Sequence, residues 1–192
     1  MEKINIIVFD FDGTLIKGDS IKLYCKWISF NLWDFILRYH LRFRIIKFFN
    51  SNFDLKFERV KYFHKKQLKR NLDINEFNLI LKENLFFDSF KILKESQSDS
   101  VVYIVSASFI EIIKSFCVNI LNVNIIANNI DNFKTYNDIN FKNKIKVLNS
   151  KIEGDYNIIR GYGNSKGDFD FMQISDQAFL RLTNGEFITW QK

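Results

Sequence analysis

Short apolar runs alternate along this sequence with longer segments that have helical spacing. The first run, residues 4–9, is rich in Ile and Val and has one polar residue, which is typical of a strand covered on both faces. Further runs of this kind occupy residues 101–105, 123–127, 156–162, 178–182 and 187–190. Strands that alternate with helices predict an α/β fold with a doubly wound, Rossmann-like parallel sheet.

The segments between these runs carry the signals of helices and turns. Helical spacing predicts helices over residues 87–95, 109–121, 144–152 and 169–175. We expect Ser108 or its neighbour to cap the second of these helices, and Thr14 to cap a helix that follows the first strand. The polar, Asn-rich residues 130–141 predict a loop or a small hairpin, and Asn184-Gly185 predicts a turn.

Residues 17–88 have a different character. Aromatic and aliphatic side chains recur three or four positions apart over 23–49, with Arg38, Arg42, Arg44 and Lys47 interleaved among them. Further helical segments follow at 57–68 and 75–83. We expect an α-helical cap at 17–88, inserted into a catalytic core of residues 1–16 and 89–192. In the favoured interpretation the aromatic side chains form a small core and the cations point outward; a lipid-contacting surface is the alternative.

Composition narrows the class of protein. The 192 residues suit one sizeable domain with an insertion, and no 18-residue uncharged apolar span predicts a membrane crossing. The net charge of +6 favours anionic partners without choosing among them, but no nucleic-acid-binding motif occurs, so we expect no nucleic acid. Cys25 and Cys117 lack metal-ligand spacing and there is no signal peptide pattern, which predicts free thiols and a cytoplasmic location.

Two carboxylates follow the first strand directly. Asp10 and Asp12 stand at the exit of a strand expected to be buried, where a carboxylate is costly unless a cation meets it. Asp-x-Asp-Gly also occurs in calcium loops and ordinary turns, but no further acids follow at calcium-loop spacing. Gly13 permits a sharp turn that brings backbone N–H groups close to an anion. This pattern favours a metal ion or a reaction centre.

Polar residues also end the second and fourth predicted strands. Ser106 follows the strand at 101–105, and Asn164 and Asp168 follow the strand at 156–162. The carboxyl ends of parallel strands meet at one edge of the sheet, which is where open α/β sheets bind their ligands. We therefore expect these side chains to form one site with Asp10 and Asp12.

In this order the motifs resemble those of the haloacid dehalogenase superfamily of phosphatases and phosphotransferases. The insertion resembles the helical cap of the branch that includes phosphoserine phosphatase. Asp10-Phe11-Asp12-Gly13-Thr14-Leu15 resembles the first motif, which implies that Asp10 is the nucleophile and Asp12 the general acid/base. Ser106, followed by Ala107, resembles the phosphate-binding second motif. Lys144 fits the third motif, with Lys142 and Lys146 as rivals, and residues 163–168 resemble the fourth.

The resemblance implies a Mg²⁺-dependent phosphatase that acts on a small phosphorylated metabolite through a phosphoaspartyl intermediate. It implies Mg²⁺ ligands at Asp10, Asp12, Asn164 and Asp168, although Asn164 stands where the family usually has Asp. Asp19 occupies a position that reads the substrate in the phosphoserine phosphatase branch. The alternatives are a lipid-phosphate phosphatase at a membrane surface and a catalytically weak regulatory protein that binds a phospholigand. Oligomeric state stays open.

Overall fold

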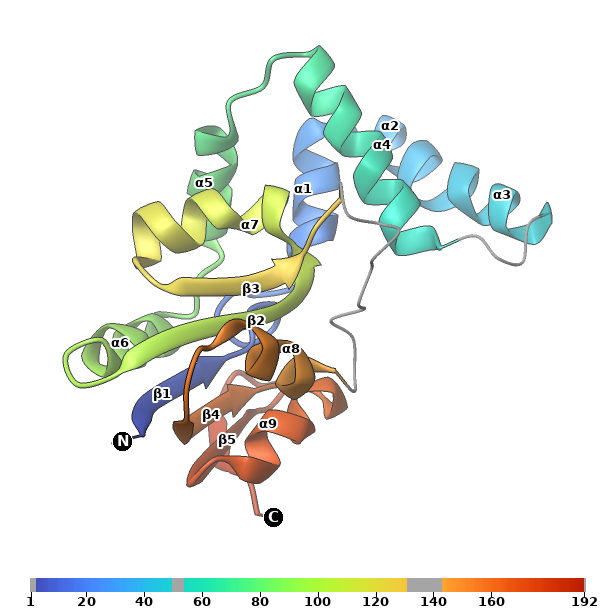
Figure 1. Ribbon diagram of the computed structural model, residues 1–192. Helices are drawn as coiled ribbons and strands as arrows, with labels where there is room; N and C mark the ends of the chain where they lie inside the picture. Colours follow the sequence, from blue (N-terminus) through green and yellow to red (C-terminus); the bar gives the residue numbers. More distant parts are fainter. Residues whose placement is uncertain (1–2, 50–53, 131–142, 192) are drawn as a thin grey trace.

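A six-stranded sheet with the order β3-β2-β1-β4-β5-β6 forms the centre of the molecule (Figure 1). The computed structural model describes residues 3–49, 54–130 and 143–191. The strands are β1 Ile4–Phe9, β2 Val101–Phe109, β3 Asn124–Asn128, β4 Tyr156–Gly163, β5 Gln177–Arg181 and β6 Phe187–Thr189. β1 to β5 pair in parallel and β6 runs antiparallel to β5, so the predicted α/β fold class is confirmed.

Helices cover both faces of this sheet. They are α6 Phe87–Ser96, α7 Ile110–Phe116 with its π-helical continuation η2 Cys117–Leu121, α8 Lys144–Lys151, the 3₁₀-helix η4 Lys166–Asp168 and α9 Phe169–Ile174. Successive residues of β1 enter different apolar clusters: Ile7 and Phe9 pack on the side of α7, and Ile6 and Val8 on the side of α8 and α9. This double burial explains why β1 is a continuous apolar run.

A group of helices lies between β1 and β2 in the chain. It comprises α1 Ser20–Ile28, α2 Leu32–Phe35, the π-helix η1 Ile36–Arg42, α3 Phe43–Phe49, α4 Leu55–Lys69 and α5 Ile74–Glu83. α1 to α4 lie together at the end of the molecule farthest from β4 and β5 (Figure 1). The fully buried Tyr24, Phe63 and Phe77 belong to the same apolar cluster as Phe9 of the sheet. The interior of these helices is therefore continuous with one face of the sheet.

The inserted segment leaves the sheet and returns to it at one point. The Lys17 amide donates to the Asn84 carbonyl at 2.7 Å, and the Phe86 amide donates to the Leu15 carbonyl at 2.9 Å. Ile16 and Leu85 form an antiparallel bridge between these two bonds. The outgoing and returning chains thus lie side by side.

Neither of the two hydroxyl side chains predicted to cap a helix, Thr14 and Ser108, does so, although the N-cap of α7 is the neighbour of Ser108. The N-cap of α1 is Asp19, which accepts from the Lys22 amide, while the Thr14 hydroxyl donates to Asp10. The N-cap of α7 is Phe109, which has no side-chain cap, and the Ser108 hydroxyl bonds the Ser20 hydroxyl. The hydroxyls are engaged by other side chains at the edge of the sheet.

The remaining expectations concern the loop, the cysteines and the membrane. Residues 131–142, which include most of the predicted loop and Lys142, lie outside the described residues. Cys25 and Cys117 are both free and buried. Within the described ranges, no helix has the length and apolar character needed to cross a bilayer.

Candidate active site

Lys144 joins two carboxylates at the carboxyl edge of the sheet. Asp10 follows β1, Asp168 ends η4 after β4, and Lys144 is the first residue of α8; all three side chains are buried. The Lys144 ammonium donates to Asp10 Oδ1 at 2.5 Å and to Asp168 Oδ1 at 2.6 Å. Lys146, its described rival, is exposed. The structure therefore brings Asp10, Lys144 and Asp168 together.

The charges in this cluster shift one another's protonation. Burial, followed by the charge of Asp168, raises the pKa of Asp10 to about 6, although Lys144 opposes the shift. Burial lowers the pKa of Lys144, but the attraction of Asp10 and Asp168 outweighs it, so that this pKa lies above its usual value. Lys144 is therefore a fixed cation, and Asp10 is ionised above about pH 6.

Asp12 occupies a different environment from Asp10. Its Oδ1 accepts from the Ser20 amide at 2.8 Å, next to the pair of hydroxyls formed by Ser20 and Ser108. Burial, then the charges of Asp19 and Asp10, raise the pKa of Asp12 to about 7. A carboxyl that is partly protonated near neutral pH can both give and take a proton.

The fourth-motif acid is held by four donors. Asp168 Oδ2 accepts from the Asn164 and Ser165 amides and from the Ser165 hydroxyl, each at 3.0 Å, while Oδ1 accepts from Lys144. This network fixes the carboxylate in one orientation. Its oxygens face the chain's own donors.

Asn164 lies against the turn that follows β1. Gly13 has a φ of +76°, and a Cβ placed there would be 2.0 Å from Asn164 Nδ2. Only glycine fits this close approach, because it has neither the side chain nor the penalty for positive φ. This contact places the side-chain amide of Asn164 beside the Asp10-Phe11-Asp12-Gly13 segment.

Ser106 and Ala107 lie where the pairing of β2 with β3 becomes irregular. Ser106 Oγ accepts from the Ser108 amide at 3.0 Å. The Ala107 carbonyl accepts from Lys56 of α4 at 2.5 Å and from Asn128 at 2.9 Å. Lys56 could not be predicted as a site residue, because one lysine among many in a helix carries no signal of what the folded helix places beside it.

Asp19, the substrate candidate, is exposed and caps α1. Its Oδ1 accepts from the Lys22 amide at 3.0 Å. The capping role of Asp19 was not predicted, although an acid just before a helix is a known cap signal.

The oxygen donors suit a hard cation but are few. Among the described residues, no three His, Cys, Asp or Glu side chains form a metal-binding cluster. The carboxylates of Asp10 and Asp12 with the side-chain amide of Asn164 are nevertheless the donor types that Mg²⁺ takes. The donor chemistry therefore fits Mg²⁺. These ligands supply two negative charges, whereas an Asp in place of Asn164 would bring the total to three.

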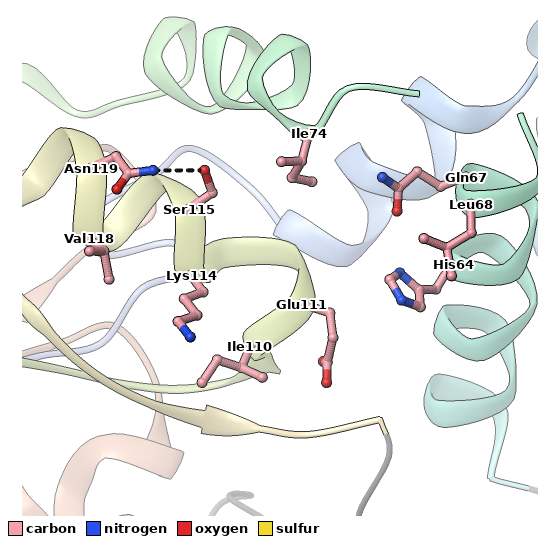
Figure 2. A pocket seen from close by; sticks show the side chains of 10 residues that line it. All are labelled: His64, Gln67, Leu68, Ile74, Ile110, Glu111, Lys114, Ser115, Val118 and Asn119. Atoms are coloured by element: carbon pink, nitrogen blue, oxygen red, sulfur yellow. Dashed lines mark hydrogen bonds between the residues drawn. The ribbon is translucent and has the colours of Figure 1, made fainter. Parts of the chain in front are cut away.

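A separate pocket of about 500 Å³ lies between α4, α5 and α7 (Figure 2). Its walls include His64 and Leu68 from α4, Ile74 from α5 and Lys114 and Val118 from the α7–η2 segment. None of the predicted site residues lines it. This pocket is therefore distinct from the cluster around Lys144.

Comparison with known proteins places the chain in a family. Residues 7–173 match the haloacid dehalogenase-like hydrolase family. The chain belongs to that family. Membership confirms the predicted superfamily and the prediction of an enzyme, and it supports a phosphatase. No curated protein matches the sequence.

Solved structures share the fold of this family member. A protein of unknown function from Bordetella pertussis Tohama I is 11% identical, with a TM-score of 0.68. The match covers 92% of this chain and 89% of the Bordetella protein. A phosphoserine phosphohydrolase-like protein from Francisella tularensis subsp. tularensis SCHU S4 is 19% identical, with a TM-score of 0.54. The match covers 92% of this chain and 86% of the Francisella protein. A phosphoserine phosphatase in its apo form is 18% identical, with a TM-score of 0.50. The match covers 92% of this chain and 85% of the phosphatase. At these identities the likeness is one of fold.

Proposed function

We propose that the protein is a Mg²⁺-dependent phosphatase that hydrolyses a phosphate monoester through a phosphoaspartyl intermediate. The observation that carries this proposal is the buried Lys144, bonded at once to Asp10 and Asp168 at the carboxyl edge of the sheet. A phosphate monoester is an anion, so an aspartate can attack it only where cations offset the repulsion. Lys144 provides one such charge.

Asp10 and Asp12 have environments that suit two different roles. In the proposed reaction an Asp10 oxygen bonds to phosphorus as the bond to the leaving oxygen breaks, and Asp12 protonates that oxygen. Asp12 then takes a proton from the water that hydrolyses the acyl phosphate, which regenerates Asp10 and releases phosphate. Burial raises the pKa of Asp12 to about 7 in the metal-free protein, which favours the protonated acid that the first transfer requires. Ser106, the backbone near Ala107 and Lys144 would hold the transferring phosphoryl oxygens.

Mg²⁺ would be held by Asp10, Asp12 and Asn164. It would add positive charge at the phosphoryl oxygens. Asp168, which the family resemblance implies as a further ligand, instead accepts four hydrogen bonds from the chain, which favours a role in orienting Lys144.

The inserted helices would act as the cap over this site. Lys56 of α4, bonded to the Ala107 carbonyl, supports a cap at 17–88 that reaches the phosphate-binding segment. We propose a small phosphorylated metabolite as substrate, with Asp19 as a candidate for reading it. The two free, buried thiols suit a reducing compartment and hence the cytoplasm.

Phosphate release from a generic aryl phosphate tests this function directly. We expect turnover with Mg²⁺ and none after chelation, because Lys144 alone does not supply the charge that the phosphoryl group requires. Radiolabelled or mass-detected phosphate on Asp10 during turnover would identify the intermediate. A folded protein that binds phosphate analogues but turns over no phosphomonoester would instead support the regulatory, phospholigand-binding alternative, which Asn164 favours.

Restoring the third acid should strengthen metal binding. We expect Asn164→Asp to lower the Mg²⁺ concentration for half-maximal activity by about tenfold, because a carboxylate adds charge to an otherwise similar oxygen donor. A Mg²⁺ titration of activity measures this effect. Asn149→Asp, at an exposed position on α8, is the control for added negative charge alone. An unchanged titration would argue against Asn164 as a ligand.

A further inference from the structure

The helical stretch formed by α2, η1 and α3 carries both buried and exposed large apolar side chains. Phe35 and Phe43 are buried, at 5% and 3% exposure, and Phe43 packs edge-on against Tyr62 of α4. Six large apolar side chains spaced three or four residues apart are nevertheless 51% to 84% exposed, although the ring of the first also meets Lys66 and Arg70 of α4: Phe30, Trp33, Leu37, Leu41, Ile45 and Phe48. We call these six residues the outer row. The predicted small aromatic core thus accounts for only part of this stretch.

A soluble surface helix normally has one apolar stripe, and a helix that is apolar on both sides is normally covered on both. Among the described elements α3 packs on α4 and α2 packs on α1, while η1 joins α2 to α3. These elements lie at the end of the molecule remote from β4 and β5 (Figure 1). An exposed row of this length is larger than the scattered apolar residues that an ordinary protein surface carries.

The charges beside the outer row indicate what covers it. Between residues 30 and 49 the cations are Arg38, Arg42, Arg44 and Lys47, and Asp34 is the one acid. Asp34 is neutralised by Arg38 and by Lys66, whose Nζ lies 2.7 Å from its Oδ2. The flanks of the row are therefore positive, which is complementary to an anionic surface.

We propose that the outer row docks the protein on the surface of an anionic phospholipid bilayer. The apolar side chains enter the boundary between head groups and acyl chains, and the flanking cations meet the lipid phosphates. Trp33 and Phe30 are of the residue types that favour this boundary. The helix lies in the plane of the surface. This docking goes beyond the proposed hydrolysis and does not depend on it.

Vesicle co-sedimentation of the full chain tests the proposal. We expect binding to vesicles of phosphatidylglycerol and phosphatidylcholine, little binding to phosphatidylcholine alone, and weaker binding as salt is raised. Leu37→Ser with Leu41→Ser should lower the affinity at least about tenfold, because two apolar contacts are lost. The matched control replaces Leu79 and Phe87, exposed apolar residues of α5 and α6, with Ser and should bind as the parent does.

Two double variants of equal net charge test whether the cations beside the outer row, rather than the total charge of the protein, promote binding. Arg44→Gln with Lys47→Gln should weaken binding to the anionic vesicles severalfold, whereas Lys65→Gln with Lys69→Gln on α4, which has the same net charge, should not. Thermal melting of all variants checks that each is folded. The proposal is overturned if the parent fails to sediment with anionic vesicles at low salt, or if the Leu37/Leu41 variant binds equally well. A parent dimer that this variant loses, without vesicle binding, would make the row a protein interface instead.

Discussion

Replacing Asp10 with asparagine should abolish phosphate release while leaving the fold intact. Asparagine has nearly the same shape and can still accept from Thr14, but its amide does not form the phosphoaspartyl bond. We expect kcat to fall by at least about a thousandfold. The measurement is phosphate release by the parent and the variant at saturating Mg²⁺, with folding checked by circular dichroism.

The stability of this variant provides an internal control. In the metal-free protein the pKa of Asp10 is about 6 against a reference of 3.8, so the folded state binds this proton more tightly than the unfolded state does. Ionisation of Asp10 therefore destabilises the fold as pH rises from about 4 through about 6. Asparagine removes that cost. Above pH 6 the metal-free Asp10→Asn protein should melt no lower than the parent, and a large drop in melting temperature would contradict this account.

Replacing Lys144 with methionine should cost both activity and stability. Methionine is similar in length but leaves two buried carboxylates, Asp10 and Asp168, without the cation that both now bond. Removing one partner of a buried ion pair costs about 3–5 kcal/mol in the free energy of unfolding. Urea unfolding at neutral pH measures the loss. It should shrink below about pH 4, where the carboxyls of the unfolded chain are protonated as well.

Two further proteins make the Lys144 experiment decisive. Lys146→Met removes an exposed lysine from the same helix and should change the free energy of unfolding by no more than about 0.5 kcal/mol. Asp10→Asn in the Lys144→Met background should recover part of the lost stability, since one of the two unpaired charges is then gone. No recovery would mean that the destabilisation comes from lost packing rather than from the carboxylates.

The sheet and the site edge follow from the sequence because their physical signals are local. The last four residues of β1, from Ile6 to Phe9, are buried on alternate faces, so four consecutive apolar residues report one environment. Asp10, Asp12, Ser106 and Asp168 each stand within a few residues of a strand end, and parallel strands align those ends. Topology then brings together residues that are distant in the chain.

Contacts made by the folded helices could not be predicted in the same way. Thr14 and Ser108 have the chemistry of helix caps, but Asp10 and Ser20 compete for their hydroxyls in the folded state. Lys56 meets Ala107 only because α4 reaches the sheet edge. Periodicity also cannot say which of two apolar helix faces becomes buried, and that is why the exposure of Trp33 and Leu37 required the structure.

The hydrogen bond between Lys17 and Asn84 bears on how the length of the helical segment between β1 and β2 can vary. The Lys17 amide and the Asn84 carbonyl, at the two ends of this helical segment, are joined by one hydrogen bond, so the chain leaves and re-enters the sheet at a fixed gap whatever the length of the segment. Closing a longer loop across a fixed gap adds only a small, logarithmic entropy cost. The segment from 18 to 83 can therefore change in length at little entropic cost, provided that its helices keep the apolar contact they share with Phe9 of the sheet.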